Sequence, residues 1–180
     1  MTELPFSEPV NVRRLPKKGE RLQLSLTDDV KKHLLSEYDL LGVDQFHCEA
    51  IVSPWKKNGV RVEGRVTAQL TQPCAVTGEP LQTKLDEIIE ALFVPEGSKL
   101  ALPRLDERGE IVLDAEGDDL PETFSGDSID LAEIWMEFFA LGYDPYARMD
   151  GVELDPDLVG DGEIGEKASP FAVLEALKKH

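Results

Sequence analysis

Apolar and polar residues alternate between Val60 and Leu70, which is the clearest periodic signal in the chain. The even-numbered positions are apolar or small, and the odd-numbered positions are charged or polar. Alternation with a period of two predicts a β-strand with one buried face and one face in water. A second alternating run covers residues 46–52, and a turn at Lys57-Asn58-Gly59 separates the two runs. We therefore predict a central antiparallel hairpin.

The turn also predicts the register of this hairpin. A three-residue loop that ends in a left-handed glycine pairs Lys56 with Val60, so that the numbers of paired residues add up to 116. Val66 then lies opposite Ala50, and the apolar positions of both strands share one face. A two-residue loop would mix apolar and polar faces, so we prefer the three-residue loop.

Further elements are predicted on either side of the hairpin. Residues 9–26 read as extended chain that is interrupted by a basic turn. Helical spacing of apolar residues predicts helices at 28–41, 130–141 and 170–179. Start and stop signals support these three helices. They are Thr27 and Gly42 around the first helix, Ser128 or Asp127 before the second, and Ser169 with Pro170 before the third.

The run from Leu81 to Val94 fits two patterns. Apolar residues at steps of three and four fit a helix, while an alternating set fits a strand nearly as well, with Glu87 as the exception. Periodicity alone slightly favours the helix. The short turn at Thr77–Pro80, directly after a strand, favours a returning strand. The pattern leaves both interpretations open.

The chain is acidic, with 36 Asp and Glu against 19 Lys and Arg and a formal net charge of −17. Residues 1–65 carry 11 basic and 10 acidic side chains, whereas residues 66–180 carry 8 basic and 26 acidic ones. A balance of +1 against −18 argues against nucleic-acid binding by the whole chain and directs any polyanion to the N-terminal third. Acidic, glycine-containing segments at 104–128 and 150–168 are predicted to be an acidic loop and a flexible segment.

Targeting signals are not apparent. The first twelve residues have no basic and apolar regions of the kind that make a secretory signal, and no apolar run reaches the length of a membrane span. Two cysteines, Cys48 and Cys74, do not make a disulfide framework. These features indicate a cytoplasmic protein that does not bind membranes.

The residues offer no catalytic or metal-binding constellation. Cys74 has Thr77 where a C-x-x-C pair would have its second thiolate, and the three histidines lack ligand spacing. His47 could activate Cys74 only if the fold brought them together, so a structural thiol is the favoured interpretation. The chain also lacks a glycine-rich phosphate loop. We expect no metal, no disulfide, no cofactor and no enzymatic activity.

Basic residues and a tryptophan cluster on the predicted polar face of the hairpin. The preferred register puts Arg61 opposite Trp55, with Arg65 farther along and two basic turns nearby. Cations beside an exposed aromatic ring can hold RNA phosphates and stack a base. The alternative is a cation–π pair that merely covers the sheet, and the residues alone favour it. The candidate RNA-binding residues are Arg13, Arg14, Lys17, Lys18, Trp55, Lys56, Lys57, Arg61 and Arg65.

Three motifs in order resemble the YceD family, whose members are described as large ribosomal RNA subunit accumulation proteins. They are Pro73–Pro80 followed by Leu92–Glu96, then Ile129–Glu133, then Ser169–Leu174, and the resemblance covers about residues 60–180. Many members carry a second cysteine where this chain has Thr77, so any role of a cysteine pair is in doubt. The motif residues that match are Pro73, Cys74, Pro80, Asp130, Leu131, Pro170 and Phe171.

The resemblance implies a bacterial cytoplasmic factor that supports synthesis, processing or stability of large-subunit ribosomal RNA, and it implies no known catalytic residue. We predict that this factor is not catalytic. The expected partners are ribosomal RNA, a basic large-subunit ribosomal protein, or both, with no DNA partner and a monomeric state. Two alternatives are a general protein-interaction module and an RNA-processing enzyme. The resemblance also favours the strand at 81–94. We therefore predict one α+β domain over 1–180, with an antiparallel curved sheet or incomplete barrel covered by three helices.

Overall fold

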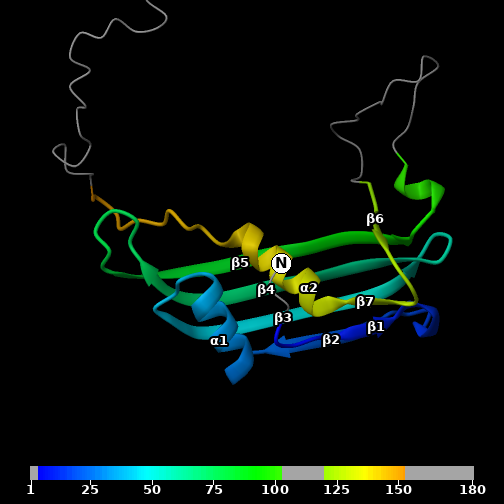
Figure 1. The fold of residues 1–180 in the computed structure, drawn as a ribbon, viewed down its shortest axis with the longest axis horizontal. Helices are drawn as coiled ribbons and strands as arrows, with labels where there is room; N and C mark the ends of the chain where they lie inside the picture. Colours follow the sequence, from blue (N-terminus) through cyan, green and yellow to red (C-terminus); the bar gives the residue numbers. More distant parts are fainter. Residues whose placement is uncertain (1–3, 103–119, 153–180) are drawn as a thin grey trace, which may run out of the picture.

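The fold of this chain is built on one long sheet (Figure 1). The computed structural model describes residues 4–102 and 120–152. In chain order the elements are β1 (Pro9–Asn11), the 3-10 helix η1 (Val12–Arg14), β2 (Glu20–Ser25), α1 (Asp28–Glu37), β3 (Gly42–Trp55), β4 (Gly59–Pro73), β5 (Pro80–Pro95), the 3-10 helix η2 (Lys99–Ala101), β6 (Glu122–Phe124), β7 (Ser128–Asp130) and α2 (Leu131–Gly142).

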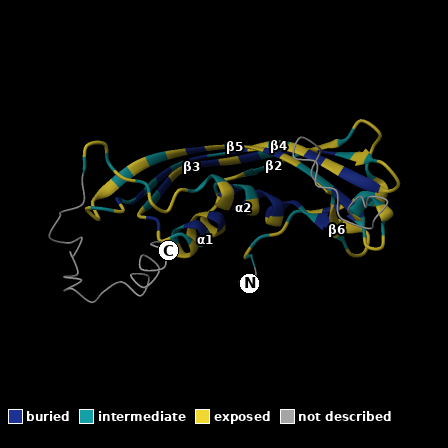
Figure 2. Cartoon of the chain, turned by 90° about the horizontal axis from the view of Figure 1, so that it is seen from above, coloured by how far each residue is buried: buried dark blue, intermediate teal, exposed yellow. Residues whose placement is uncertain are grey.

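Five strands lie in the order β2-β3-β4-β5-β6, and β1 pairs separately with β7. The first four strands form the predicted antiparallel meander, so the strand interpretation of residues 81–94 is confirmed. The short β6 runs parallel to β5, which the sequence did not indicate. Within the described residues the sheet is curved and open, and it does not close into a barrel (Figure 2).

The predicted hairpin register is wrong by two residues. Trp55 pairs with Gly59 and Cys48 pairs with Val66, so paired numbers add up to 114. The loop consists of residues 56–58, in which Lys57 and Asn58 take the left-handed conformation, with φ of 49° and 66°. Gly59 belongs to the strand instead. A Cβ atom on Gly59 would lie 2.8 Å from the carbonyl oxygen of Phe93, so glycine is required for close approach to β5.

Both helices of the described residues cover one face of the sheet (Figure 2). A register error of two residues leaves each side chain on its predicted face. The even-numbered residues of β4 therefore point to these helices, and all of them except Gly64 are buried. Phe139 of α2 is fully buried, and its ring lies 4.9 Å from that of Tyr38 and 6.0 Å from that of Phe46, measured between centroids. The odd-numbered face carries charged and polar residues.

Both described helices differ from their predicted limits. Thr27 caps α1 as predicted, but the helix ends at Glu37 because Asp39 takes a left-handed conformation with φ of 50°. Helix α2 is capped by Asp130 rather than by Ser128 or Asp127, because β7 pairs with β1 up to that residue. In the described part of the chain, no helix is long and apolar enough to span a membrane.

Several predictions fall outside the described residues. These are the helix at 170–179 and most of the segments 104–128 and 150–168. Part of the predicted acidic loop is described, and there residues 122–124 form β6 instead of loop. Pairing with β5 supplies the hydrogen bonds that keep this short stretch extended.

Candidate functional site

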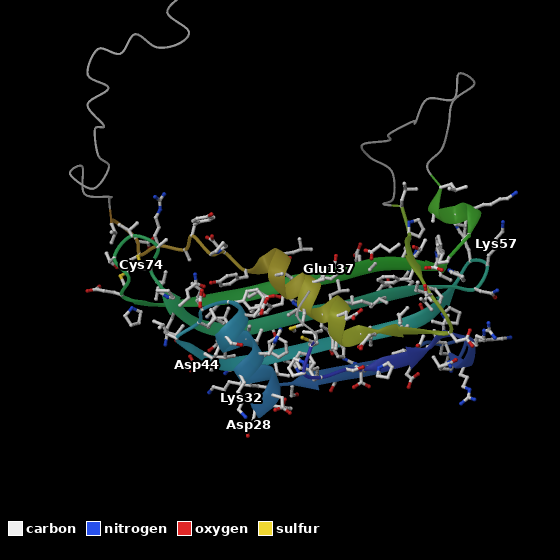
Figure 3. All side chains as sticks on the ribbon, viewed as in Figure 1. Asp28, Lys32, Asp44, Lys57, Cys74 and Glu137 are labelled. Carbon is white, nitrogen blue, oxygen red and sulfur yellow. The ribbon has the colours of Figure 1, made fainter. Side chains whose placement is uncertain are left out.

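Two basic turns meet at one end of the sheet, which we call the basic end. The turn before β2 contains Lys17 and Lys18, and its Gly19 packs on β3. A Cβ atom added to Gly19 would lie only 3.2 Å from the Cβ of Ser53. The turn between β3 and β4 contains Lys56 and Lys57, and Lys56 comes three residues after Ser53. Figure 3 labels Lys57 at this end of the sheet. Helix η1 adds two arginines just ahead of the first turn, Arg13 and Arg14.

Three of the predicted RNA-binding arginines already pair with carboxylates. Arg13 lies 2.7 Å from Asp127, and Arg61 lies 3.6 Å from Glu63. Arg65 forms a two-pronged ion pair with Asp86.

The Arg65–Asp86 pair lies away from the basic end, since Arg65 faces Glu49 across β3 and β4. Their mutual hydrogen bonds raise the pKa of Arg65 and lower the pKa of Asp86. A guanidinium that is occupied in this way must lose a partner before it can hold phosphate. Arg65 is therefore the least suitable of the candidate residues.

The predicted contact between Arg61 and Trp55 is wrong. Arg61 lies opposite Ser53 because of the corrected register. Lys56 takes its place, with its Nζ atom 4.9 Å from the centroid of the Trp55 ring. The ring of Trp55 is half-buried, so it is covered in part by the turn that carries it.

Five exposed cations of the basic end form no ion pair with any described residue. Four of them come from two turns whose chains contact one another, and Arg14 ends η1 just ahead of the first turn, so a single polyanion can reach all three segments. Ammonium groups act as point charges for phosphate, without the geometric selectivity of a two-pronged arginine contact. This arrangement suits a polyphosphate backbone rather than a particular base. The five residues are Arg14, Lys17, Lys18, Lys56 and Lys57.

The opposite end of the sheet, where Figure 3 labels Cys74, holds the Pro73–Pro80 part of the first family motif. Pro73 pairs with Pro80 at the base of the loop between β4 and β5. Inside the loop, the Cys74 backbone donates to the Glu79 carbonyl oxygen at 2.8 Å, and the Gly78 N–H donates to the Cys74 carbonyl oxygen at 2.8 Å. The side chain of Cys74 is only 2% exposed, as expected of a structural thiol.

The surroundings of Cys74 are polar, unlike an ordinary core site. Hydrogen bonds from the side chain and backbone of Thr77, and from the backbone of Met149 and Val76, lower the pKa of the Cys74 thiol to about 6. Thr77 occupies the position of the missing second cysteine and stabilises the thiolate instead. Sequence spacing alone did not indicate this role.

The two cysteines and His47 lie far apart. Cys48 faces Val66 in β4, and Cys74 follows eight residues later, which is about 26 Å along a strand. His47 faces Thr67, about 23 Å from Cys74 by the same reasoning. Activation of Cys74 by His47 therefore lacks the required contact. The described ranges, 4–102 and 120–152, contain no cluster of three or more His, Cys, Asp or Glu side chains that could hold a metal. The predicted lack of a bound metal stays a prediction.

The second family motif forms a joint between three segments. Asp130 Oδ1 accepts hydrogen bonds from the backbone N–H groups of Ala132, at 2.9 Å, and Glu8, at 2.8 Å. Its Oδ2 accepts from the Ser7 hydroxyl at 2.6 Å. Leu131, the other matched residue of this motif, is fully buried. One sequence signal could have revealed that Asp130 caps α2: Glu133 follows it by three residues, just before an apolar run. Pro170 and Phe171 of the third motif lie outside the described residues.

Comparisons with known proteins place the chain in a family. Neither the curated proteins nor the solved structures that were searched contain a match. A family model described as "Large ribosomal RNA subunit accumulation protein YceD" matches residues 62–178, which is well over half of the 180 residues. The match includes the cysteine loop, the Asp130 joint and the C-terminal motif. The chain belongs to the YceD family of large ribosomal RNA subunit accumulation proteins.

Proposed function

We propose that this protein is a non-catalytic factor that supports synthesis, processing or stability of large-subunit ribosomal RNA. It binds ribosomal RNA through the basic end and a basic ribosomal protein through its acidic remainder. The observation that carries the proposal is the group of five exposed cations that pair with no described residue, on two adjacent turns and the end of η1, in a chain whose family is named for ribosomal RNA accumulation. The protein is further proposed to be cytoplasmic, monomeric and a single domain.

The charge distribution supports two separate surfaces. Residues 66–180 carry 26 acidic and 8 basic side chains, which repel phosphate and attract a cationic partner. The basic end lies within residues 1–65, where acidic and basic side chains nearly balance. RNA affinity should therefore be low for the isolated protein and should rise when a basic partner neutralises the acidic surface.

The test compares two double variants that change charge equally. Lys56→Glu with Lys57→Glu alters the basic end, and Lys31→Glu with Lys32→Glu alters exposed positions on α1 (Figure 3 labels Lys32 and Lys57). Binding of fragments of large-subunit ribosomal RNA is measured by fluorescence anisotropy. We expect the first variant to bind about tenfold more weakly than the wild type and the second to stay within about twofold.

Other outcomes select other functions. Equal weakening by both double variants would show that RNA responds only to the overall charge. Cleavage or modification of ribosomal RNA by the purified protein would establish an enzyme. A protein that captures neither ribosomal RNA nor a ribosomal protein would be an interaction module unrelated to ribosomes.

A further inference from the structure

The outer edge of β5 is open over much of its length. Its other edge pairs with β4 from Pro80 to Phe93, but β6 lies beside it only at Phe93–Pro95. At the other end, residues 144–148 and residues 81–83 line one shallow pocket. Between these limits, from Lys84 to Leu92, no described residue forms a strand against this edge (Figure 1). Nine residues span about 30 Å in a strand.

The backbone groups that point outward can be assigned from hydrogen bonds at the two ends of the strand. The Glu79 carbonyl oxygen, just before β5, accepts from Cys74 on the β4 side. The Glu96 N–H, just after β5, donates to Phe124 on the β6 side. Successive residues point in opposite directions, and the pairing of β4 with β5 has no register shift. The N–H and C=O groups of the even-numbered residues from Lys84 to Leu92 therefore point outward.

Carboxylates border this edge on both faces of the sheet. Glu90 is exposed on the polar face. Glu87 points to the opposite face, beside Gly142 of α2, and a Cβ atom added to Gly142 would collide with the Glu87 side chain. On the helix side lie Glu122 of β6 and Glu137 of α2. Burial, and then the nearby charge of Glu137, raise the pKa of Glu122. None of these four carboxylates forms an ion pair with a described residue. The edge therefore combines unpaired backbone groups with excess negative charge.

We propose that the open edge of β5 takes up an extended, basic polypeptide segment as an additional strand. The proposal rests on the proposed function and specifies how the basic protein partner binds. Backbone hydrogen bonds to the outward groups would hold the segment, and its cationic side chains would face Glu90 on one side and Glu87 and Glu137 on the other. Exposed Ile88, with 63% of its surface accessible, offers an apolar contact between the carboxylates.

Charge disfavours the other occupants of this edge. A second copy of the chain would bring the same carboxylates against themselves, which is a common way to prevent pairing of edge strands. The chain's own residues 103–119 contain seven acidic and two basic side chains, so they would be repelled as well. RNA would meet the same carboxylates and could not form the backbone ladder.

The probe is a synthetic peptide of about twelve residues in which pairs of arginines alternate with pairs of valines, so that each face of the added strand carries arginine. Added to the full chain, it should slow hydrogen exchange at the backbone amides of Asp86, Ile88 and Glu90. A matched peptide of equal charge, N-methylated at alternate residues, should bind about tenfold more weakly because it cannot form the ladder. This comparison uses the wild-type protein and so does not depend on how any variant folds.

Two variants at one position separate backbone from side chain. Ile88→Pro removes an outward N–H without removing a hydrogen bond to β4, and proline is tolerated in edge strands. It should weaken binding of the arginine peptide about tenfold, whereas Ile88→Ala should weaken it no more than about threefold. Thermal unfolding of both variants checks that the sheet is intact.

Several results would overturn the proposal. One is equal binding of the two peptides by the wild type, which would mean attraction by charge alone. Others are protection of the basic end or of β2 instead of β5, protection of the same amides by an RNA oligonucleotide, and a dimer joined through β5 in ultracentrifugation. None of these results alters the comparison of RNA binding between the two lysine double variants. Failure of the strand-addition proposal is therefore distinguishable from failure of the proposed function.

Discussion

The two cysteines show how strongly local surroundings set the behaviour of one side-chain type. Cys48 is enclosed in the core beneath the helices, and burial raises the pKa of its thiol. Cys74 is equally inaccessible, but hydrogen-bond donors from Thr77, Val76 and Met149 surround its sulfur atom and lower its pKa. Burial removes water from both thiols, and only the donors decide which charge state is favoured.

Cys74 should make the stability of the protein depend on pH. Its pKa of about 6 in the folded state lies below the usual value of 9.0, so folding favours the thiolate. This contribution is fully present above pH 9 and is lost as the pH falls towards 6. Urea unfolding should therefore show that Cys74→Ser, which keeps the fold, loses this pH dependence.

Cys48→Ala provides the control for that experiment. Below about pH 8 the Cys48 thiol is protonated in the folded state because burial raises its pKa, and in the unfolded state because its ordinary pKa lies higher. Cys48→Ala should therefore keep the slope of the wild type in that range. The thiolate assignment would be contradicted if the free energies of unfolding of the wild type and of Cys74→Ser differed by the same amount at every pH from 6 to 9.

At the scale of elements, Asp130 joins pieces that are distant in the chain. One carboxylate caps α2 and also binds the segment before β1, which is more than 120 residues away. Helix α2 supplies Trp135 and Phe139, two of the largest fully buried side chains. The position of this core helix therefore depends on a polar contact at its first turn.

Asp130→Ala should destabilise the protein by about 2 kcal/mol, because it removes the cap and leaves the backbone N–H groups of Glu8 and Ala132 without their acceptor. Asp130→Asn keeps one oxygen acceptor and should cost less. The free energy of unfolding in urea gives both values. Asp127→Ala is the matched control, since it removes only an exposed ion pair with Arg13 and should cost less than about 1 kcal/mol. Equal losses for Asp127→Ala and Asp130→Ala would disprove the joint.

At the scale of the whole molecule, the ends of the sheet differ in chemistry. The basic end gathers free cations, and the other end holds the loop of Cys74 (Figure 3). Between them the polar face is largely self-neutralised, since Arg21 pairs with Glu49 and Arg65 pairs with Asp86. Polyanion binding should therefore be local to one end.

The salt dependence of RNA binding should report how many cations take part. Five free cations at the basic end predict a slope of about −3.5 when the logarithm of the association constant is plotted against the logarithm of salt concentration for single-stranded RNA. Anisotropy titrations between low and physiological salt measure this slope, and Lys56→Glu with Lys57→Glu should reduce its size. A slope of about −5.6 would mean that the three paired arginines, Arg13, Arg61 and Arg65, also contact phosphate.

Much of the fold could be predicted from local patterns. Alternation between Val60 and Leu70 assigned the buried face of the central strand correctly, because the side-chain period survives a register error of two. Thr27 and the apolar stripe of α2 marked helices whose existence is confirmed. Helix ends and the hairpin pairing were less accurate, since they depended on left-handed residues such as Asp39 and Asn58, whose conformation no periodicity reveals.

The sequence by itself determined which stretches form strands and helices, which faces they bury, and that positive charge lies in the N-terminal third. Only the tertiary structure decided that Arg65 is occupied by Asp86, that donors from two segments surround Cys74, and that one edge of β5 is open. The physical reason is the distance along the chain over which the interactions act. Periodicity and capping act between near neighbours in the chain, whereas ion pairs, the surroundings of a thiol and strand edges depend on residues that meet only after the sheet has formed.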